Sequence, residues 1–474
     1  MRLFQSLAMG LALAALTFAS TTAKAVTQTN WEYNRLNRPS DTVGALGNGL
    51  FGEQVDLYSG GTEFATTDIS IPGNGSLPVR LGRRLEVAEA DQYGGLQSFA
   101  NWEVDVPYLT TYLASLSNTP PGWVLASGTT NRCSVPLNQP QSAGPPNYQG
   151  TDSDLSPWDY WSGYQMYVPG AGSQEMLVDS TASPAGSAYH WTTKDNWVIS
   201  CVGLQSGGTG EGFVATSPQG VTYTFDRMLY RGGAQNQVLV KEWTNGSGQD
   251  VYFRYKYWIV ASSATDRFGN TVHYNYNASN ELTSITATGP TGASDGRSVT
   301  INWGTDGNIQ TASDGTHTWT YNYATATAVY GDNRIPEVLT SVVQPDTSSW
   351  SYQYGGSLVL TDTRPTEDPP PVTCTTPEWK RLTGEAVTGN STLFYTFTAT
   401  HPSGEVGTFQ FAPLIRGRSN VTQDCFDEGA LYPKESAQFA LQSKTLSDPI
   451  LPSQPAYTWA YTWEPLETKL AEQP

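Results

Sequence analysis

The stretch DRFGNTVHYNYNASNELTSIT, residues 266–286, decides the fold that this sequence predicts. Within it, Val272, Tyr274 and Tyr276 alternate with polar residues across 271–277. Successive side chains of an extended strand point to opposite faces, so this two-residue period places the apolar members on one face and the polar members on the other. The pattern is typical of a half-buried β-strand.

Residues on either side of this strand favour chain reversal. Gly269 and Asn270 precede it, and both residue types tolerate positive φ. A second reversal is predicted at 277–280, where two asparagines flank Ala and Ser, and it leads into a second strand that begins at Leu282. The unit is therefore turn, strand, turn, strand.

The same alternation recurs along the chain, and no long window has the 3.6-residue spacing of a helix. Further alternating segments lie at 221–225, 299–303, 319–323 and 457–463. The chain contains 46 glycines and 30 prolines, and 12% of its residues are aromatic. Turn residues separate short runs that are rich in Thr, Tyr and Val, as in β proteins. The predicted fold class is all-β: antiparallel sheets and β-hairpins, with a short repeat-like sheet between β-sandwich-like regions.

Proline-rich runs divide the chain, because proline offers no N–H to a sheet. These runs, at 136–157 and 357–377, are predicted to be linkers. The remaining regions are predicted as a signal peptide (1–25), an N-terminal β region (26–135), a second β region (158–264), a repeat-like region (265–356), a C-terminal β region (378–465) and a tail (466–474).

The first 25 residues have the order of a cleaved secretory signal. Arg2 is followed by an apolar run over 7–18 and by the small-x-small sequence Ala-Lys-Ala at 23–25. The mature chain is predicted to begin at Val26 and to be secreted, periplasmic or attached to the cell surface. No other stretch has the roughly 18 uninterrupted apolar residues that a spanning helix needs, so no membrane span is expected.

The charge of the chain disfavours nucleic acid as a partner. The formal net charge is −18, and removing Arg2 and Lys24 with the signal makes it −20. A field of this sign repels phosphate backbones.

Cys133, Cys201, Cys374 and Cys425 are an even set, which favours two disulfides in an oxidising compartment. Three pairings are possible. Cys133–Cys201 and Cys374–Cys425 are favoured because each closes a loop within one predicted region. No pair has the close spacing of a zinc site, and no metal or cofactor is expected.

The opening stretch resembles the YD repeat of RHS-type proteins, whose pattern is Asp-x-x-Gly-Asn, a strand, then Tyr-x-Tyr-Asp-x-x-Gly-Arg-Leu-Thr-x-Ile-Thr. Asn277, Asn280 and Glu281 stand where that pattern has Asp, Gly and Arg, and asparagine is the next-best residue for a left-handed turn position. The matching residues are Asp266, Gly269, Asn270, Tyr274, Tyr276, Leu282, Thr283, Ile285 and Thr286.

Other segments extend the resemblance. Weaker matches to the repeat lie at 295–303, 314–323 and 344–354. Residues 65–80 resemble the entry segment that precedes the repeats in bacterial RHS proteins, and 212–225 resembles the hairpin just before them. The chain is thus similar to an N-terminal portion, or a short relative, of an RHS/YD-repeat protein.

The resemblance implies a coiled antiparallel sheet that, in this family, often encloses a C-terminal toxin domain. Four repeat units are too few to close a cavity, because each unit buries its face only against its neighbours. The expected function is that of an exported structural or interaction protein, as part of a toxin-associated shell or a cell-surface assembly. Its expected partner is a protein, either other RHS segments or a toxin domain, or a cell-surface glycan.

An enzyme is the least favoured class. Residues 292–296 read Gly-x-Ser-x-Gly, but a hydrolase elbow needs a helix after Ser294, and a strand is predicted there. The histidines form no ligand-spaced pair, and Asp152 and Asp154 lack the Gly and Glu of a calcium loop. No catalytic residue is predicted. The histidines considered are His190, His273, His317 and His401.

The alternative function is a secreted glycan-binding or adhesive module. Fifteen Trp and 26 Tyr provide flat faces on which sugars can stack, with clusters at 158–161 and 457–463. The alternation favours burial of these rings in sheet interfaces instead.

Overall fold

The computed structural model describes residues 49–57, 60–73, 75, 77–87, 98–115, 123–125, 128–135, 163–178, 190–231, 238–242, 249–325, 337–356, 395–417, 435–449 and 455–463. Gly47–Pro474 forms one compact unit. Its strands pair antiparallel and no helix occurs among the described residues, which confirms the all-β prediction. In this part of the chain, accordingly, no helix is long and apolar enough to cross a membrane.

A small sheet contains four strands in the order β1-β2-β3-β4. β2 and β3 pair along their length, with a bulge between Thr67 and Ile69 that leaves Asp68 outside the regular register. A bulged residue can turn its side chain away from the alternation of its strand. The bounds are β1 (Glu53–Val55), β2 (Thr62–Ile71), β3 (Val79–Val87) and β4 (Glu103–Val104).

Eight further strands close a ring, because β13 pairs with β11 along one edge and with β5 along the other. From β5 to β11 each described strand pairs with the next. β12 (Val238–Glu242) pairs with the first part of β13. The ring contains β5 (Tyr108–Ser115), β6 (Gln165–Val168), β7 (Gly172–Val178), β8 (Trp191–Thr193), β9 (Val198–Gly203), β10 (Glu211–Thr216), β11 (Thr222–Arg231) and β13 (Gln249–Thr265).

The interior of this ring is a packed core. Trp123, Tyr164, Phe213 and Tyr257 lie in it, with exposures of 0%, 1%, 0% and 1%. An eight-stranded barrel is just wide enough for side chains to fill it, and the described side chains pack together inside this ring.

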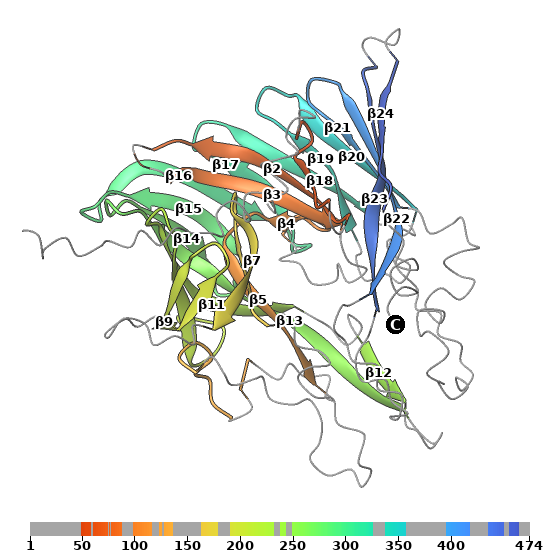
Figure 1. The fold of residues 1–474 in the computed structure, drawn as a ribbon. Helices are drawn as coiled ribbons and strands as arrows, with labels where there is room; N and C mark the ends of the chain where they lie inside the picture. The colour runs from red at the N-terminus through yellow and green to blue at the C-terminus, as the bar shows by residue number, and fades with distance from the viewer. Residues whose placement is uncertain are drawn as a thin grey trace, which may run out of the picture. The chain divides into compact units, whose positions relative to one another are not determined.

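β13 also starts a long meander, because its last residues, Ser263 to Thr265, pair with β14 on one side and with β11 of the ring on the other. From β14 to β24 each strand pairs with the next, and we call these strands the repeat sheet (Figure 1). They are β14 (Thr271–Tyr276), β15 (Leu282–Thr288), β16 (Ser294–Trp303), β17 (Ile309–Ser313), β18 (Thr318–Thr325), β19 (Glu337–Val343), β20 (Ser349–Gly356), β21 (Tyr395–Thr400), β22 (Val406–Gly417), β23 (Glu435–Ser447) and β24 (Tyr457–Ala460).

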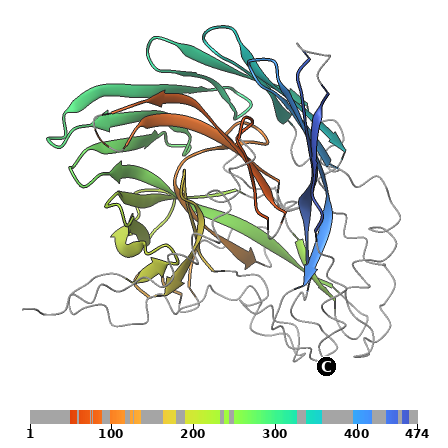
Figure 2. The same ribbon diagram turned by 45° about the horizontal axis from the view of Figure 1, so that its top comes forward.

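The small sheet covers the inner face of the repeat sheet (Figures 1 and 2). Phe64 of β2 packs edge-on against Phe397 of β21 and Phe409 of β22, with ring centroids 4.6 and 4.8 Å apart. Most predicted aromatic rows face this core. The row at 457–463 differs, because Tyr457 is 59% exposed, and the expected burial is wrong for that residue.

Candidate functional site

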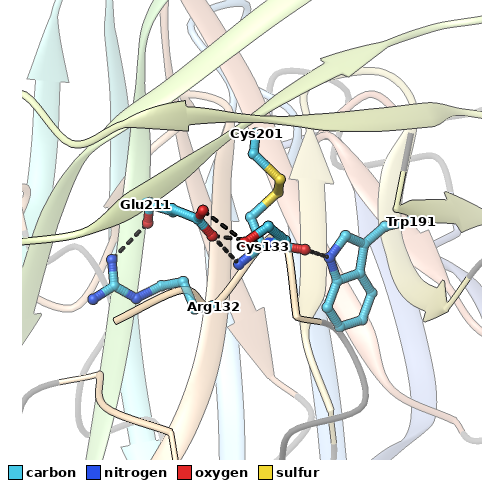
Figure 3. Close-up of a disulfide and its surroundings, with 6 residues drawn as sticks. Arg132, Cys133, Trp191, Cys201 and Glu211 are labelled. Carbon is cyan, nitrogen blue, oxygen red and sulfur yellow. Dashed lines mark hydrogen bonds between the residues drawn. A yellow bond between two sulfur atoms is a disulfide. The ribbon is translucent and has the colours of Figure 1, made fainter. Parts of the chain in front are cut away.

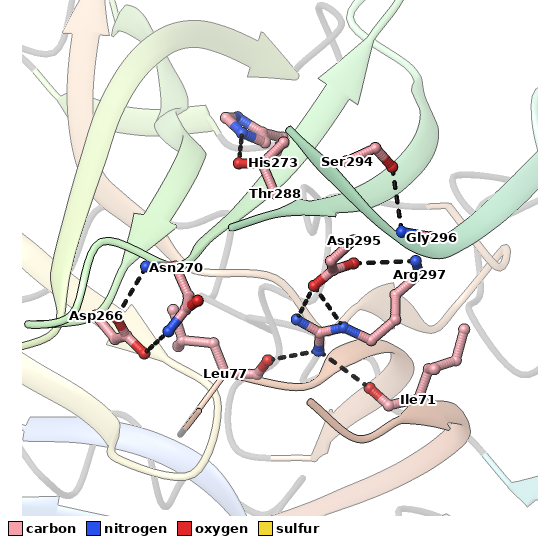
Figure 4. Close-up of polar contacts among 10 residues, drawn as sticks. All are labelled: Ile71, Leu77, Asp266, Asn270, His273, Thr288, Ser294, Asp295, Gly296 and Arg297. Carbon is pink, nitrogen blue, oxygen red and sulfur yellow. Dashed lines mark hydrogen bonds and ion pairs between the residues drawn. The ribbon is translucent and has the colours of Figure 1, made fainter. Parts of the chain in front are cut away.

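The turn that opens the YD-like stretch is built around the carboxylate of Asp266. Its Oδ1 accepts hydrogen bonds from the backbone N–H of Phe268 (2.9 Å) and Asn270 (3.0 Å), and its Oδ2 accepts one from Asn270 Nδ2 (2.9 Å; Figure 4). Burial opposes ionisation, but these hydrogen bonds lower the pKa of Asp266. Gly269 has φ +86°, whereas Asn270 does not need the positive φ that its type allows.

The next turn repeats this geometry with different residues. Asn277 Oδ1 accepts from the N–H of Ser279 (2.9 Å) and Glu281 (3.0 Å). Asn280 holds the positive-φ position at 59°. The substitutions of Asn for Asp and of Asn for Gly therefore preserve the turn, as the sequence predicted.

The same backbone pattern occurs in further turns of the described chain. In each, the first N–H donates to the fifth carbonyl, the fourth N–H donates to the first carbonyl, and the fourth residue has positive φ. This is a type I turn followed by a left-handed residue that forms a bulge. These turns begin at Leu125, Thr193, Ser217, Gly289, Gly304, Gln344 and His401.

Replacing Gly269 with alanine is expected to destabilise the protein by about 1–2 kcal/mol, because an L side chain is strained at φ +86°. The matched change Asn280→Gly is expected to alter stability by less than about 0.5 kcal/mol, since glycine adopts φ 59° without strain. Urea unfolding followed by tryptophan fluorescence measures both. Equal effects of the two changes would contradict the assignment of these turns.

The remaining repeat residues lie on β14 and β15. Leu282 is 2% exposed and belongs to the core, and Tyr274 packs against both hydrophobic cores. The Tyr276 hydroxyl donates to the carbonyl of Ala261 (3.3 Å), and the Thr283 hydroxyl donates to that of Asn275 (3.1 Å). Tyr274 and Tyr276 therefore join the repeat sheet to the ring of strands, whereas the Thr283 bond stays within the repeat sheet.

Arg297 of β16 holds the connection between β2 and β3. Its Nη1 donates to the carbonyls of Leu77 (2.9 Å) and Ile71 (3.5 Å), and its Nη2 pairs with Asp295 Oδ2 (2.6 Å; Figure 4). Hydrogen bonds from Arg297 lower the pKa of Asp295. The segment 295–303 therefore contacts the segment 65–80 through Arg297.

The most buried ion pair of the described residues lies within the small sheet, between β2 and β3, and bonds tyrosines of the repeat sheet. Arg83 Nε lies 2.9 Å from Asp68 Oδ2, and both side chains are 0% exposed. The Arg83 guanidinium also bonds the Tyr352 hydroxyl and lies 5.1 Å from the ring centroid of Trp102. Burial alone would lower the pKa of Arg83, but Asp68 and neighbouring tyrosines raise it. Arg83 is therefore a permanent buried cation.

Arg84, the next residue, points to the other side of β3 and meets an excess of carboxylates. Its guanidinium bonds Glu63 Oε2 (3.1 Å) and Glu103 Oε2 (2.8 Å), and Glu86 Oε2 lies 3.8 Å away. Burial raises the pKa of Glu63 to about 7, although Arg84 opposes the shift.

Glu63 therefore makes stability depend on pH. Between about pH 4.5 and 7 the folded protein holds a proton that the unfolded chain has lost, so stability falls as pH rises through this window. The fall due to Glu63 is at most about 3 kcal/mol. We expect Glu63→Gln to reduce this fall in stability. The measurement is the free energy of unfolding of wild type and of the variant, each at pH 4.5 and at pH 8. Glu175→Gln on β7 is the exposed control, and an unchanged profile in Glu63→Gln would contradict the prediction.

Cys133 and Cys201 form a disulfide between a loop and β9 (Figure 3). This is one of the two pairings that the sequence favoured, whereas Cys374 and Cys425 lie outside the described residues. Glu211 Oε2 accepts from the N–H of Cys133 (3.0 Å), and the Cys133 carbonyl accepts from Trp191 Nε1 (2.8 Å). The loop is thus held to the ring by covalent and polar contacts.

Residues considered for catalysis have local partners. Ser294 Oγ accepts from the N–H of Gly296 (3.2 Å), and Ser294 begins β16 rather than preceding a helix. His273 Nε2 lies 3.1 Å from Thr288 Oγ1, and His317 Nδ1 lies 3.1 Å from Asp314 Oδ2.

His401 bonds the Ser403 hydroxyl, and the backbone N–H of His190 donates to the Ile199 carbonyl (3.0 Å). Over the described ranges, no group of His, Cys, Asp and Glu side chains could hold a metal ion. The predicted signal (1–25), Asp152, Asp154 and the aromatic cluster at 158–161 lie outside those ranges.

Sequence reasoning missed the buried arginines. Arg83, Arg84 and Arg132 are 0%, 2% and 1% exposed. A signal was present, because adjacent arginines at 83–84 interrupt an apolar strand and must point to opposite faces. Arg132 lacks such a signal: its guanidinium donates to the Trp123 carbonyl, with Nη2 at 2.9 Å, inside a loop.

No family model matches the chain, and no curated protein matches it. A solved structure titled "Crystal Structure of TcdB2-TccC3-TEV" is similar at 10% sequence identity and a TM-score of 0.18. The match covers 62% of this chain and 16% of that chain, and at this TM-score it supports no argument.

Proposed function

We propose that this chain is an exported structural or interaction protein of the RHS/YD-repeat type. One observation carries the proposal. The five-residue turn of 266–270 recurs at 277–281, 289–293, 304–308, 344–348 and 401–405, so the repeat sheet uses one hairpin turn again and again. Such recurrence is expected where similar units stack on their neighbours.

The proposed role is that of a surface module more than a cargo shell. In the described chain the inner face of the repeat sheet is already covered by β1–β4, and the ring of strands is filled by its own side chains. A partner such as another repeat protein, a toxin domain or a glycan would therefore meet the outer face, the turns or the sheet edges.

Export is part of the proposal and has a direct test. The Cys133–Cys201 disulfide favours an oxidising compartment. We expect the intact mass of the protein expressed from its full reading frame to correspond to a chain that starts at Val26 with this disulfide formed. An uncleaved, reduced chain that stays in the cytoplasm would contradict export.

The absence of catalysis is also proposed. Ser294→Ala is expected to leave unchanged any background turnover of chromogenic esters and glycosides by the purified protein. A hydrolysis rate that Ser294→Ala abolishes, while the variant keeps the wild-type circular dichroism spectrum, would replace this proposal with a hydrolase.

A further inference from the structure

Most outward positions of the repeat sheet carry small, uncharged polar side chains, with His273 of β14 as an exception. Strand registers align outward residues in rows that cross the sheet. One row runs from Asn302 to Ser349 through Thr311, Thr320 and Val343.

A second row contains amide and hydroxyl groups alone. It consists of Gln353, Thr398, Thr408, Thr445 and Thr458. Two further rows are built in the same way. One crosses the strands from Asn275 to Thr318 and the other from Asn322 to Ser447, with Ser, Thr, Asn and a single Val at the registered positions. We call these four rows the hydroxyl face.

No Asp, Glu, Lys or Arg stands on the hydroxyl face, although the chain carries a net charge of −18. Several carboxyl side chains of the repeat sheet lie instead in its turns, among them Asp306, Asp314 and Asp346. There the backbone N–H groups of His317 and Thr316 lower the pKa of Asp314 to about 2. The face is thus kept electrically neutral between charged rims.

This composition excludes several kinds of partner. A phosphate polymer or an anionic surface needs cations, and none lies on these rows. A tight protein interface needs aromatic or arginine anchors at its centre, and the rows contain neither. The chemistry that remains is an uncharged ligand that both donates and accepts hydrogen bonds.

The polar groups are held in place before any ligand arrives. Asn302 Nδ2 donates to Thr311 Oγ1 (3.1 Å), and Asn322 Nδ2 donates to Ser341 Oγ (3.0 Å). An amide has a second N–H and a carbonyl oxygen with two lone pairs, so each of these asparagines keeps further capacity. Fixed side chains lose less conformational entropy on binding than free ones.

We propose that the hydroxyl face binds an uncharged polysaccharide laid across the strands. The inference rests on the interaction module proposed above and names its partner class. Sugar hydroxyls match the face because they are neutral donors and acceptors. Single hydrogen bonds contribute little in water, so binding requires an extended polymer that contacts several rows at once.

Affinity electrophoresis of the full-length oxidised protein tests this proposal. Native gels contain dextran, mannan, xylan or the anionic polymer polygalacturonate, and mobility is expressed relative to a gel without polymer. We expect retardation by at least one neutral polymer and no weakening in high salt, because no charges take part.

Variants locate the surface. Thr320→Glu and Asn322→Glu place a charge at exposed positions of β18, and we expect each to weaken binding about tenfold or more. Thr305→Glu adds the same charge at an exposed turn position outside the rows and is expected to bind like wild type. Circular dichroism checks that all three variants fold.

Three outcomes would overturn the inference: no retardation by any neutral polymer, retardation by polygalacturonate alone, or an equal loss in Thr305→Glu. A folded, exported protein that gives one of these results would leave the proposed function standing. Failure of export or a Ser294-dependent turnover would instead remove the proposed function.

Discussion

Asp68→Asn is expected to lower the free energy of unfolding by about 3–5 kcal/mol, because it leaves a buried charge without its partner. Arg83 lies 2.9 Å from Asp68 with both side chains 0% exposed. A guanidinium cannot shed its proton, so the variant must keep an uncompensated cation between the two sheets. The Tyr321 hydroxyl, which donates to Asp68 Oδ2 (3.1 Å), is also affected.

The measurement is urea unfolding at neutral pH, followed by tryptophan fluorescence. The control is the double variant Asp68→Leu/Arg83→Met, which removes both charges and is expected to recover most of the lost stability, since buried pairs can be replaced by apolar residues at little cost. If the free energy of unfolding of Asp68→Asn lies within about 1 kcal/mol of the wild-type value, this pair does not hold the small sheet in place.

Loss of the Cys133–Cys201 disulfide is expected to have the next largest effect. The bond spans 68 residues, and a loop of that length restricts the unfolded chain by about 4 kcal/mol in the chain-entropy treatment. We expect the double variant Cys133→Ala/Cys201→Ala to unfold at a lower urea midpoint than the oxidised wild type.

Reductant provides the control for this second prediction. Wild type in dithiothreitol is expected to unfold near the midpoint of the double variant, whereas the variant is insensitive to dithiothreitol. Attack on the Cys133 sulfur requires opening of the loop because Cys133 is 0% exposed, whereas Cys201 is only partly buried. An oxidised wild type no more stable than the variant would contradict the prediction.

Several elements were predictable because their signals are local. The alternation at 271–277 gave β14 (Thr271–Tyr276), with Val272 2% exposed. Asn280 was expected at a left-handed turn position and has φ 59°. A two-residue period and a tolerance of positive φ depend on neighbouring residues alone, so the sequence contains them directly. The predicted domain boundaries stay a prediction, although strands from 26–135 and 158–264 pair within one compact unit.

The contacts that organise the candidate site were not predictable in this way. Arg83 reaches Tyr352, which lies 269 positions further along the chain, and Asp68 can meet Arg83 because it occupies a bulge in β2. Nothing near these residues in sequence specifies such partners. The rows of the hydroxyl face are equally hidden in the sequence, because a row becomes visible only when the strand registers are known.

The amino-acid sequence by itself determined that the chain forms short antiparallel strands joined by turns that contain a residue with positive φ. The side-chain period and the tolerance of positive φ both depend on only a few neighbouring residues. Only the tertiary structure decided that β13 joins a filled ring to the repeat sheet, that β1–β4 occupy the inner face, and which carboxylate each buried arginine meets. Those features depend on which strands pair across long separations, where burial of apolar surface from the whole chain selects one arrangement.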